Sequence, residues 1–183
     1  MGTSHPVRYH PYYCEENARW LCADSALGAG ERRVVFISNE TRSVLLAHQR
    51  AGGGDGRVVW DYHVICLAAD PGGGWQVWDL DTTLGMPVGA ALYLSQTFSR
   101  RAPPELRPRF RVIDAARFRE TFSTDRSHMR IESGGYQQPP PPWDPPRVEG
   151  VSTNLMRFLE MEGVFEGELM DLDDLVGRYG SSG

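Results

Sequence analysis

Apolar and polar positions along this chain of 183 residues follow two periods, and each period predicts a kind of element. From Cys14 to Ser25, apolar or small residues recur every three or four positions, which predicts a helix that begins at Cys14. Short runs rich in β-branched and aromatic residues predict strands, and these runs lie at 33–38, 59–67, 76–81 and 110–113. Helical segments are also expected at 89–101, 115–122, 155–159 and 169–176.

Strands and helices intermix along the chain without a regular βαβ alternation. The expected fold class is therefore α/β or α+β, with a mainly antiparallel sheet flanked by helices. The length predicts one domain over residues 1–183, with flexible tails at 1–8 and 178–183. The proline run at 139–142 is expected to be an extended strap over the surface of its own domain. Binding to an aromatic-lined groove of another protein is the alternative for this run.

Composition and charge argue against several classes of function. The net charge of −5 argues against binding nucleic acid through its phosphates. No apolar run approaches the roughly 20 residues that span a bilayer, and the N-terminus lacks the apolar core of a secretory signal, so we expect no membrane association. The three cysteines are unevenly spaced and do not predict a disulfide framework. Reduced thiols in an intracellular compartment are expected.

The strongest chemical signal is a histidine and an aspartate on two neighbouring strands. His63 lies in one strand-like run and Asp79 lies sixteen residues later in the next, with the turn-forming segment 70–74 between them. If the runs pair as a hairpin centred near Pro71, His63 faces Asp79 with Cβ atoms roughly 5 Å apart. Asp61 and Asp81 would face each other on the same side, and either could replace Asp79 if the strands slipped by two residues.

Cys14 is a candidate nucleophile for this pair. The first turn of a helix favours a thiolate, because the positive end of the helix dipole lies there. Glu15 and Glu16 oppose that effect, so an imidazolium at His63 would be needed, with Asp79 fixing the tautomer of the ring. A structural role stays open for each of these residues, since cysteine is often a small core residue. Cys22 and Cys66 fit such a core role.

A metal site is a further alternative use of the thiols and imidazoles. The possible ligands are Cys14, Cys22, Cys66, His63 and His128. No pair among them has the close spacing that is typical of zinc sites, so no metal site is expected.

Several segments resemble the family of protein N-terminal glutamine amidohydrolases. The Trp-Asp-Tyr-His-Val motif that gives this family its name is unbroken at 60–64. Blocks at 13–17, 35–40, 79–82, 109–112 and 125–129 are also similar and occur in the family's order. The proline run and Asn154-Leu155 continue the similarity, which covers residues from about 9 to 167. The segment from Glu168 onward is not matched with the family's pattern.

The resemblance implies a thiol-dependent amidase. Such an enzyme deamidates the side chain of an N-terminal glutamine, in a protein or peptide, to glutamate and releases ammonia. The nucleophile in that family is the cysteine of Cys-Glu-Glu-Asn, here Cys14. The base is the histidine of the naming motif, here His63, and the orienting acid is the first aspartate of Asp-Leu-Asp, here Asp79.

The resemblance also implies a single domain with a core like those of papain and transglutaminases, acting as a monomer without a cofactor. The products of the family feed an N-degron route, in which N-terminal glutamate is arginylated before degradation. The cytoplasm is the expected compartment, with the nucleus as a second one.

Restriction to chain termini requires groups that recognise a free α-ammonium in a closed cleft. The candidates are Glu15, Asp61, Asp81, Ser127 and His128. Two other function classes stay open. One is a related thiol enzyme, either a peptidase or a transglutaminase-type acyl transferase, and the other is an inactive module that binds N-terminal residues.

Overall fold

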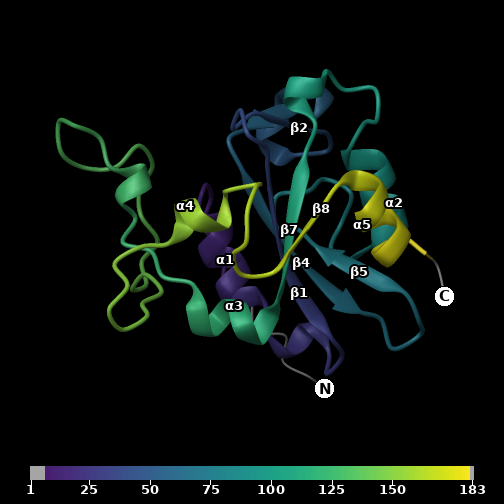
Figure 1. Ribbon diagram of the computed structural model, residues 1–183, viewed down its shortest axis with the longest axis horizontal. Coiled ribbons are helices and arrows are strands. Elements are labelled where there is room, and N and C mark those ends of the chain that lie inside the picture. The colour runs from purple at the N-terminus through teal and green to yellow at the C-terminus, as the bar shows by residue number, and fades with distance from the viewer. Residues whose placement is uncertain (1–6, 182–183) are drawn as a thin grey trace.

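A computed structural model describes residues 7–181 of the protein, and a six-stranded sheet forms its centre (Figure 1). The strand order is β6-β5-β4-β1-β7-β8, and every neighbouring pair is antiparallel. These strands are β1 (Arg32–Ser38), β4 (His63–Ala69), β5 (Trp75–Trp78), β6 (Val88–Gly89), β7 (Arg109–Asp114) and β8 (Glu168–Met170). A separate two-stranded sheet pairs β2 (Val44–Leu46) with β3 (Val58–Trp60). The expected single α+β domain with a mainly antiparallel sheet is confirmed.

Helices cover both faces of the large sheet, because its central strands are apolar on both sides. Along β1, Val34 and Phe36 belong to one core, while Val35 and Ile37 belong to the other. The first core includes residues of α1 (Cys14–Leu21), α3 (Ala115–Thr121) and α4 (Leu155–Phe158). The second includes residues of α2 (Ala90–Thr97) and α5 (Leu172–Tyr179). Short 3₁₀ turns lie at Ser25–Leu27, Arg50–Asp55, Pro104–Leu106 and Ser127–Met129.

The hairpin that carries the candidate pair differs from the predicted register by two residues. Cys66 pairs with Trp78 and Leu67 with Val77, so the ladder, if continued, sets Asp79 opposite Ile65 rather than His63. A shift by an even number keeps every side chain on its original face of the sheet. Asp79 therefore stays on the same side as His63.

The predicted continuous strand over 59–67 is wrong. Trp60 ends β3 in the small sheet and His63 begins β4 in the large one, with Asp61 and Tyr62 between them. The hydroxyl of Ser38 donates a hydrogen bond to the carbonyl oxygen of Asp61 at 2.7 Å, which ties this break to the end of β1. The break sets His63 at the very start of a central strand.

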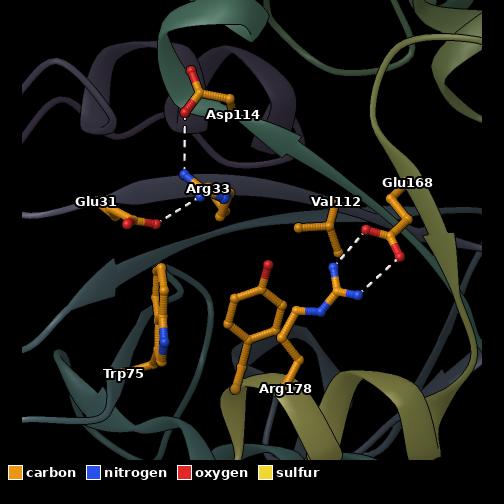
Figure 2. Close-up of a pocket in the computed structure, with 8 residues that line it drawn as sticks. Glu31, Arg33, Trp75, Val112, Asp114, Glu168 and Arg178 are labelled. Atoms are coloured by element: carbon orange, nitrogen blue, oxygen red, sulfur yellow. Dashed lines mark hydrogen bonds and ion pairs between the residues drawn. The ribbon is translucent and has the colours of Figure 1, made fainter.

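The C-terminal segment was predicted as one helix over 169–176, but it forms the edge strand β8 and then α5. Figure 2 shows Arg178 of α5 reaching back to Glu168 of β8, with a 2.9 Å hydrogen bond between Nη2 and Oε1. The expected tail from 178 is wrong for Arg178 and for Tyr179, which is buried. Residues 182–183 of that tail lie outside the described part of the chain.

The expected N-terminal tail is wrong for Val7 and Arg8. Val7 packs against the core, and the guanidinium of Arg8 lies 3.9 Å from the ring centroid of Trp20. Residues 1–6 of the expected tail lie outside the described residues. No helix within 7–181 has both the length and the apolar character needed to cross a bilayer.

The proline run is attached to the segment around the start of α1, as expected for a strap over its own domain. The ring of His10 is hydrogen-bonded through Nε2 to the carbonyl oxygen of Pro139 at 2.7 Å, and the Tyr13 hydroxyl donates to that of Gln138 at 3.1 Å. Arg126 donates to the carbonyl oxygens of Pro141 and Trp143. These contacts join the strap to the helix that carries Cys14.

Candidate active site

A cavity of about 750 Å³ lies where α1 and β4 begin. Five of the eight residues predicted for the site line it, namely Cys14, Asp61, His63, Asp81 and His128. Cys14 begins α1 and His63 begins β4, so the thiol and the imidazole enter one cavity from two different elements.

His63 and Asp79 form a buried pair, with 2.9 Å between Nε2 and Oδ1. Asp79 reaches the ring across the diagonal of the shifted hairpin, because β5 ends at Trp78 and Asp79 is the next residue. Three further donors hold this carboxylate: the backbone N–H of Asp81 at 2.9 Å, the amide of Gln49 at 3.1 Å and the hydroxyl of Tyr93 at 2.8 Å. Although the register of the hairpin is shifted by two residues, Asp79 remains the partner of His63, and neither Asp61 nor Asp81 takes its place.

Charge at this pair opposes the effect of burial. Burial alone would lower the pKa of His63, but the charge and hydrogen bond of Asp79, with smaller contributions from Asp81 and Glu15, raise it overall. Burial likewise tends to raise the pKa of Asp79, while His63 and the other donors together hold it below its usual value. The two groups thus stabilise each other's charged forms.

The surroundings of the Cys14 thiol disfavour its ionised form. Its burial raises the pKa well above the ordinary value, the charges of Glu15, Asp81 and Asp61 add to the rise, and the backbone N–H of Val64 opposes it. The charge of Glu15 thus opposes the thiolate, as expected from the sequence, and burial adds to that opposition. A base must take the proton, and Nδ1 of His63 is available because no hydrogen bond within residues 7–181 engages it.

A second polar group lies beside the thiol. The carboxylate of Glu15 is fully buried, and its Oε2 accepts a hydrogen bond from the hydroxyl of Tyr62 at 3.0 Å and lies 3.8 Å from Sγ of Cys14. Nε2 of His128 lies 3.5 Å from Oε1 of Glu15 and 3.3 Å from the Tyr62 hydroxyl. Tyr62 and His128 line the cavity, and Glu15 lies behind them.

Of the other predicted substrate-binding residues, Asp61 and Asp81 line the cavity and Ser127 does not. Asp81 lines the cavity and accepts a 2.6 Å hydrogen bond from the hydroxyl of Tyr9. Asp61 also lines it but is exposed to solvent. Ser127 is exposed and does not line the cavity, and its backbone N–H is bonded to Asp125 at 2.9 Å. The prediction that Ser127 contacts a substrate finds no support in this arrangement.

Gln49 and Tyr93 were not predicted as site residues. Gln49 lies between β2 and the 3₁₀ turn at Arg50–Asp55, and Tyr93 occupies a position on α2 that resembles a core aromatic. Neither has a sequence spacing that relates it to Asp79. Only the folded chain brings their donors to the carboxylate.

One group of side chains offers the donor types of a metal site. Ligand atoms of His63, Asp79 and Asp81 lie within 4.8 Å of one another. Nε2 of His63 is already hydrogen-bonded to Asp79, and protein donors engage the carboxylates of Asp79 and Asp81, so a cation would have to displace these hydrogen bonds. Cys22 and Cys66, considered as ligands from the sequence, are instead buried in the first core.

A second cavity, of about 370 Å³, lies beside α5 and is drawn in Figure 2. Arg33 on its wall pairs with Glu31 at 2.7 Å and with Asp114 at 3.1 Å. Its lining shares no residue with the cavity that holds Cys14 and contains neither a cysteine nor a histidine. The chemistry of nucleophile and base belongs to the larger cavity.

Comparison with known proteins decides the family. A sequence profile described as N-terminal glutamine amidase matches residues 9–179. The chain belongs to the N-terminal glutamine amidase family. The matched span includes β8 and α5, so the family similarity extends past residue 167, where it was expected to end.

Relatives in the N-terminal glutamine amidase family are similar over most of their length. The protein N-terminal glutamine amidohydrolase of Homo sapiens is 37% identical over 180 residues, which cover 94% of this chain and 88% of that protein. The protein of the same name from Arabidopsis thaliana is 37% identical, covering 88% of this chain and 81% of its own. That of Drosophila willistoni is 40% identical, covering 93% and 87%.

Proposed function

We propose that this protein hydrolyses the side-chain amide of an N-terminal glutamine, giving glutamate and ammonia, with Cys14 as nucleophile, His63 as base and Asp79 as the orienting acid. The observation that carries the assignment of roles is the buried His63–Asp79 pair, at 2.9 Å, in the wall of the cavity that Cys14 enters. Family membership over residues 9–179 supports the reaction.

The reaction begins with transfer of the Cys14 thiol proton to Nδ1 of His63. Sγ then attacks the δ-carbon of the substrate amide, and the tetrahedral intermediate collapses when His63 gives the proton to the departing ammonia. A thioester remains, and His63 activates the water that hydrolyses it to glutamate and free thiol. Asp79 holds the proton on Nε2 and stabilises the imidazolium at each step.

The oxyanion of each tetrahedral intermediate needs donors. Backbone N–H groups in the first turn of a helix have no acceptor within that helix, and Cys14 occupies the first position of α1. Its N–H is thus a donor beside the reacting sulfur. Asparagine is shorter than glutamine by one methylene, and a displacement of about 1 Å at the reacting carbon can reduce the rate about a hundredfold. Glutamine is therefore the preferred residue.

Three matched peptides test this function: one beginning with glutamine, one with asparagine and one with acetylated glutamine. Mass spectrometry should detect the mass gain of deamidation only in the first, together with released ammonia. Cys14→Ser should abolish it, while Cys22→Ala, which removes a core thiol on the same side of the sheet, should retain it. Cleavage of the peptide bond would identify a peptidase, and amine incorporation a transglutaminase. Binding without turnover would identify an inactive recognition module.

A further inference from the structure

Two adjacent glutamates at the start of α1 are both fully buried, but among residues 7–181 only Glu16 is paired with an arginine. Glu16 receives two hydrogen bonds from Arg126, at 2.6 and 2.8 Å, and one from the indole of Trp143 at 2.9 Å. Oε2 of Glu15 receives a hydrogen bond from the hydroxyl of Tyr62 and a longer one, at 3.8 Å, from the thiol of Cys14, and Oε1 has no hydrogen-bond partner among the described residues. A buried carboxylate normally requires a pairing cation. In the described part of the chain, the only basic side chain close to the carboxylate of Glu15 is the imidazole of His128.

The imidazole of His128 separates this carboxylate from the cavity. Its Nε2 faces Oε1 of Glu15 at 3.5 Å, while the residue lines the cavity that contains Cys14. Burial lowers the pKa of His128, although the charges of Asp61, Glu16 and Asp125 act in the opposite direction, and the net shift favours the neutral ring. With the proton of a neutral ring on Nε2, Nδ1 carries a lone pair, and no hydrogen bond within 7–181 engages that nitrogen.

We infer that His128 and Glu15 recognise the α-ammonium of the substrate. Nδ1 of His128 accepts a hydrogen bond from the ammonium, and the negative charge of Glu15, on the other side of the imidazole ring, stabilises the positive charge of the ammonium. This inference rests on the proposed function and names the groups that restrict it to chain termini. Tyr62 holds Oε2 of Glu15 in place. An acetylated terminus has neither the positive charge nor the same donors and is excluded.

The electrostatics of Glu15 agree with this role. Burial raises its pKa to about 7, the charge of Glu16 adds to the rise, and hydrogen bonds from its own backbone, Tyr62 and Cys14 oppose it. An ammonium bound one imidazole away would favour the ionised form. The carboxylates of Asp61 and Asp81 are weaker candidates, because Asp61 is exposed and Asp81 already accepts a hydrogen bond from Tyr9.

The test compares two peptides that differ only at the first residue, one with terminal glutamine and one in which a hydroxyl replaces the α-ammonium. Both present the same amide to Cys14, so the ratio of their kcat/KM values cancels effects on the thiol. The wild-type protein should prefer the ammonium peptide. Glu15→Gln and His128→Phe should each reduce that preference on the order of 10- to 100-fold, mainly through KM, as expected for loss of a hydrogen bond to a charged group.

Glu120→Gln is the matched control, because it makes the same chemical change at an exposed position of α3 and should preserve the preference. Circular dichroism establishes that each variant is folded, and His128→Phe provides the test if Glu15→Gln does not fold. An unchanged preference in the folded variants, or its loss in Asp61→Asn alone, would overturn the inference. A wild-type protein that deamidates neither peptide would instead overturn the proposed function, and this inference with it.

Discussion

At the scale of single residues, Asp79 determines which nitrogen of His63 can act. It accepts four hydrogen bonds, from the His63 ring, the Asp81 backbone, Gln49 and Tyr93. Because the bond to His63 is made at Nε2, a neutral ring carries its proton there and keeps Nδ1 as the base. The carboxylate therefore selects a tautomer as well as supplying charge.

Asp79→Asn should lower kcat on the order of 10³- to 10⁴-fold while leaving the fold intact. An asparagine amide that donates to Nε2 places the ring proton on Nδ1, which can then no longer accept the thiol proton. Burial lowers the pKa of His63 and Asp79 raises it, so removing the charge lowers that pKa. Since His63 must be unprotonated to act as base, the acidic limb of the kcat/KM profile should move to lower pH.

Tyr93→Phe is the control for this prediction, because it removes one donor to Asp79 and leaves the negative charge. We expect a loss of no more than about tenfold, the equivalent of one hydrogen bond. Steady-state kinetics between pH 5 and 9 measure both variants. Retention of wild-type kcat by Asp79→Asn would contradict the tautomer argument.

At the scale of elements, the ion pair between Arg126 and Glu16 joins α1 to the loop before the proline strap. Both side chains are buried, and Arg126 also donates to the carbonyl oxygens of Pro141 and Trp143. The start of the helix that carries Cys14 is therefore fixed from outside the helix. Its N-cap, Tyr13, makes no side-chain capping hydrogen bond.

Arg126→Met should reduce the free energy of unfolding by about 3–5 kcal/mol, because it leaves the carboxylate of Glu16 buried without a cation. The double variant with Glu16→Gln should recover part of that loss. Arg100→Gln is the control: it breaks the pair with Asp173, whose side chains are 62% and 76% exposed, and should change stability by less than about 1 kcal/mol. Urea denaturation measures all three, and equal losses for the buried and exposed pairs would contradict the prediction.

The periodicity of apolar residues predicted the start of a helix correctly, whereas the predicted register of the hairpin was wrong. The start of α1 at Cys14 followed from apolar spacing, but the hairpin was centred on Pro71. In the structure the turn closes through hydrogen bonds between Asp70 and Gly74 and between Asp70 and Gly73. Both glycines have positive φ, so the turn centres one residue later and shifts the register by two. Turn geometry of this kind is not encoded in the strand pattern.

The site residues that could be predicted are those identified by their residue type and by the side of the sheet on which they lie. Cys14 and His63 do line one cavity, and the pair with Asp79 survived the shift because an even slip preserves the face. Gln49 and Tyr93 were not predictable, since their contacts with Asp79 cross from the small-sheet region and from α2. Such contacts depend on packing between segments that are far apart in the sequence, and a local sequence pattern does not predict them.

At the scale of the whole molecule, the site and the C-terminal segment are separate. Figure 1 shows the loops around the proline strap and helix α5 at opposite ends of the long axis. The cavity that holds Cys14 and the one beside α5 have no lining residue in common. We therefore expect changes near β8 to alter stability and to leave catalysis by the folded protein unaffected.

Gly167 allows the chain to enter β8, and replacing it tests this separation. Its φ is +82°, and a Cβ there would lie 2.5 Å from the carbonyl oxygen of Val112 and from Cγ1 of Ile113. Gly167→Ala should thus lower the free energy of unfolding by about 2–4 kcal/mol, from the left-handed backbone and the overlap together. Well below the melting temperature, kcat should be unchanged.

Gly163→Ala isolates the contribution of the overlap. Gly163 has a similar φ of +73°, but a Cβ there would meet no atom within 4 Å, so only the backbone cost of about 1–2 kcal/mol is expected. Thermal and urea denaturation compare the two variants, and kcat is measured on each at a temperature where it is folded. Equal destabilisation would show that the close approach to β7 does not constrain Gly167. A reduced kcat in folded Gly167→Ala would show that the C-terminal segment positions the site, and the two ends of the molecule would then have to be treated as one unit.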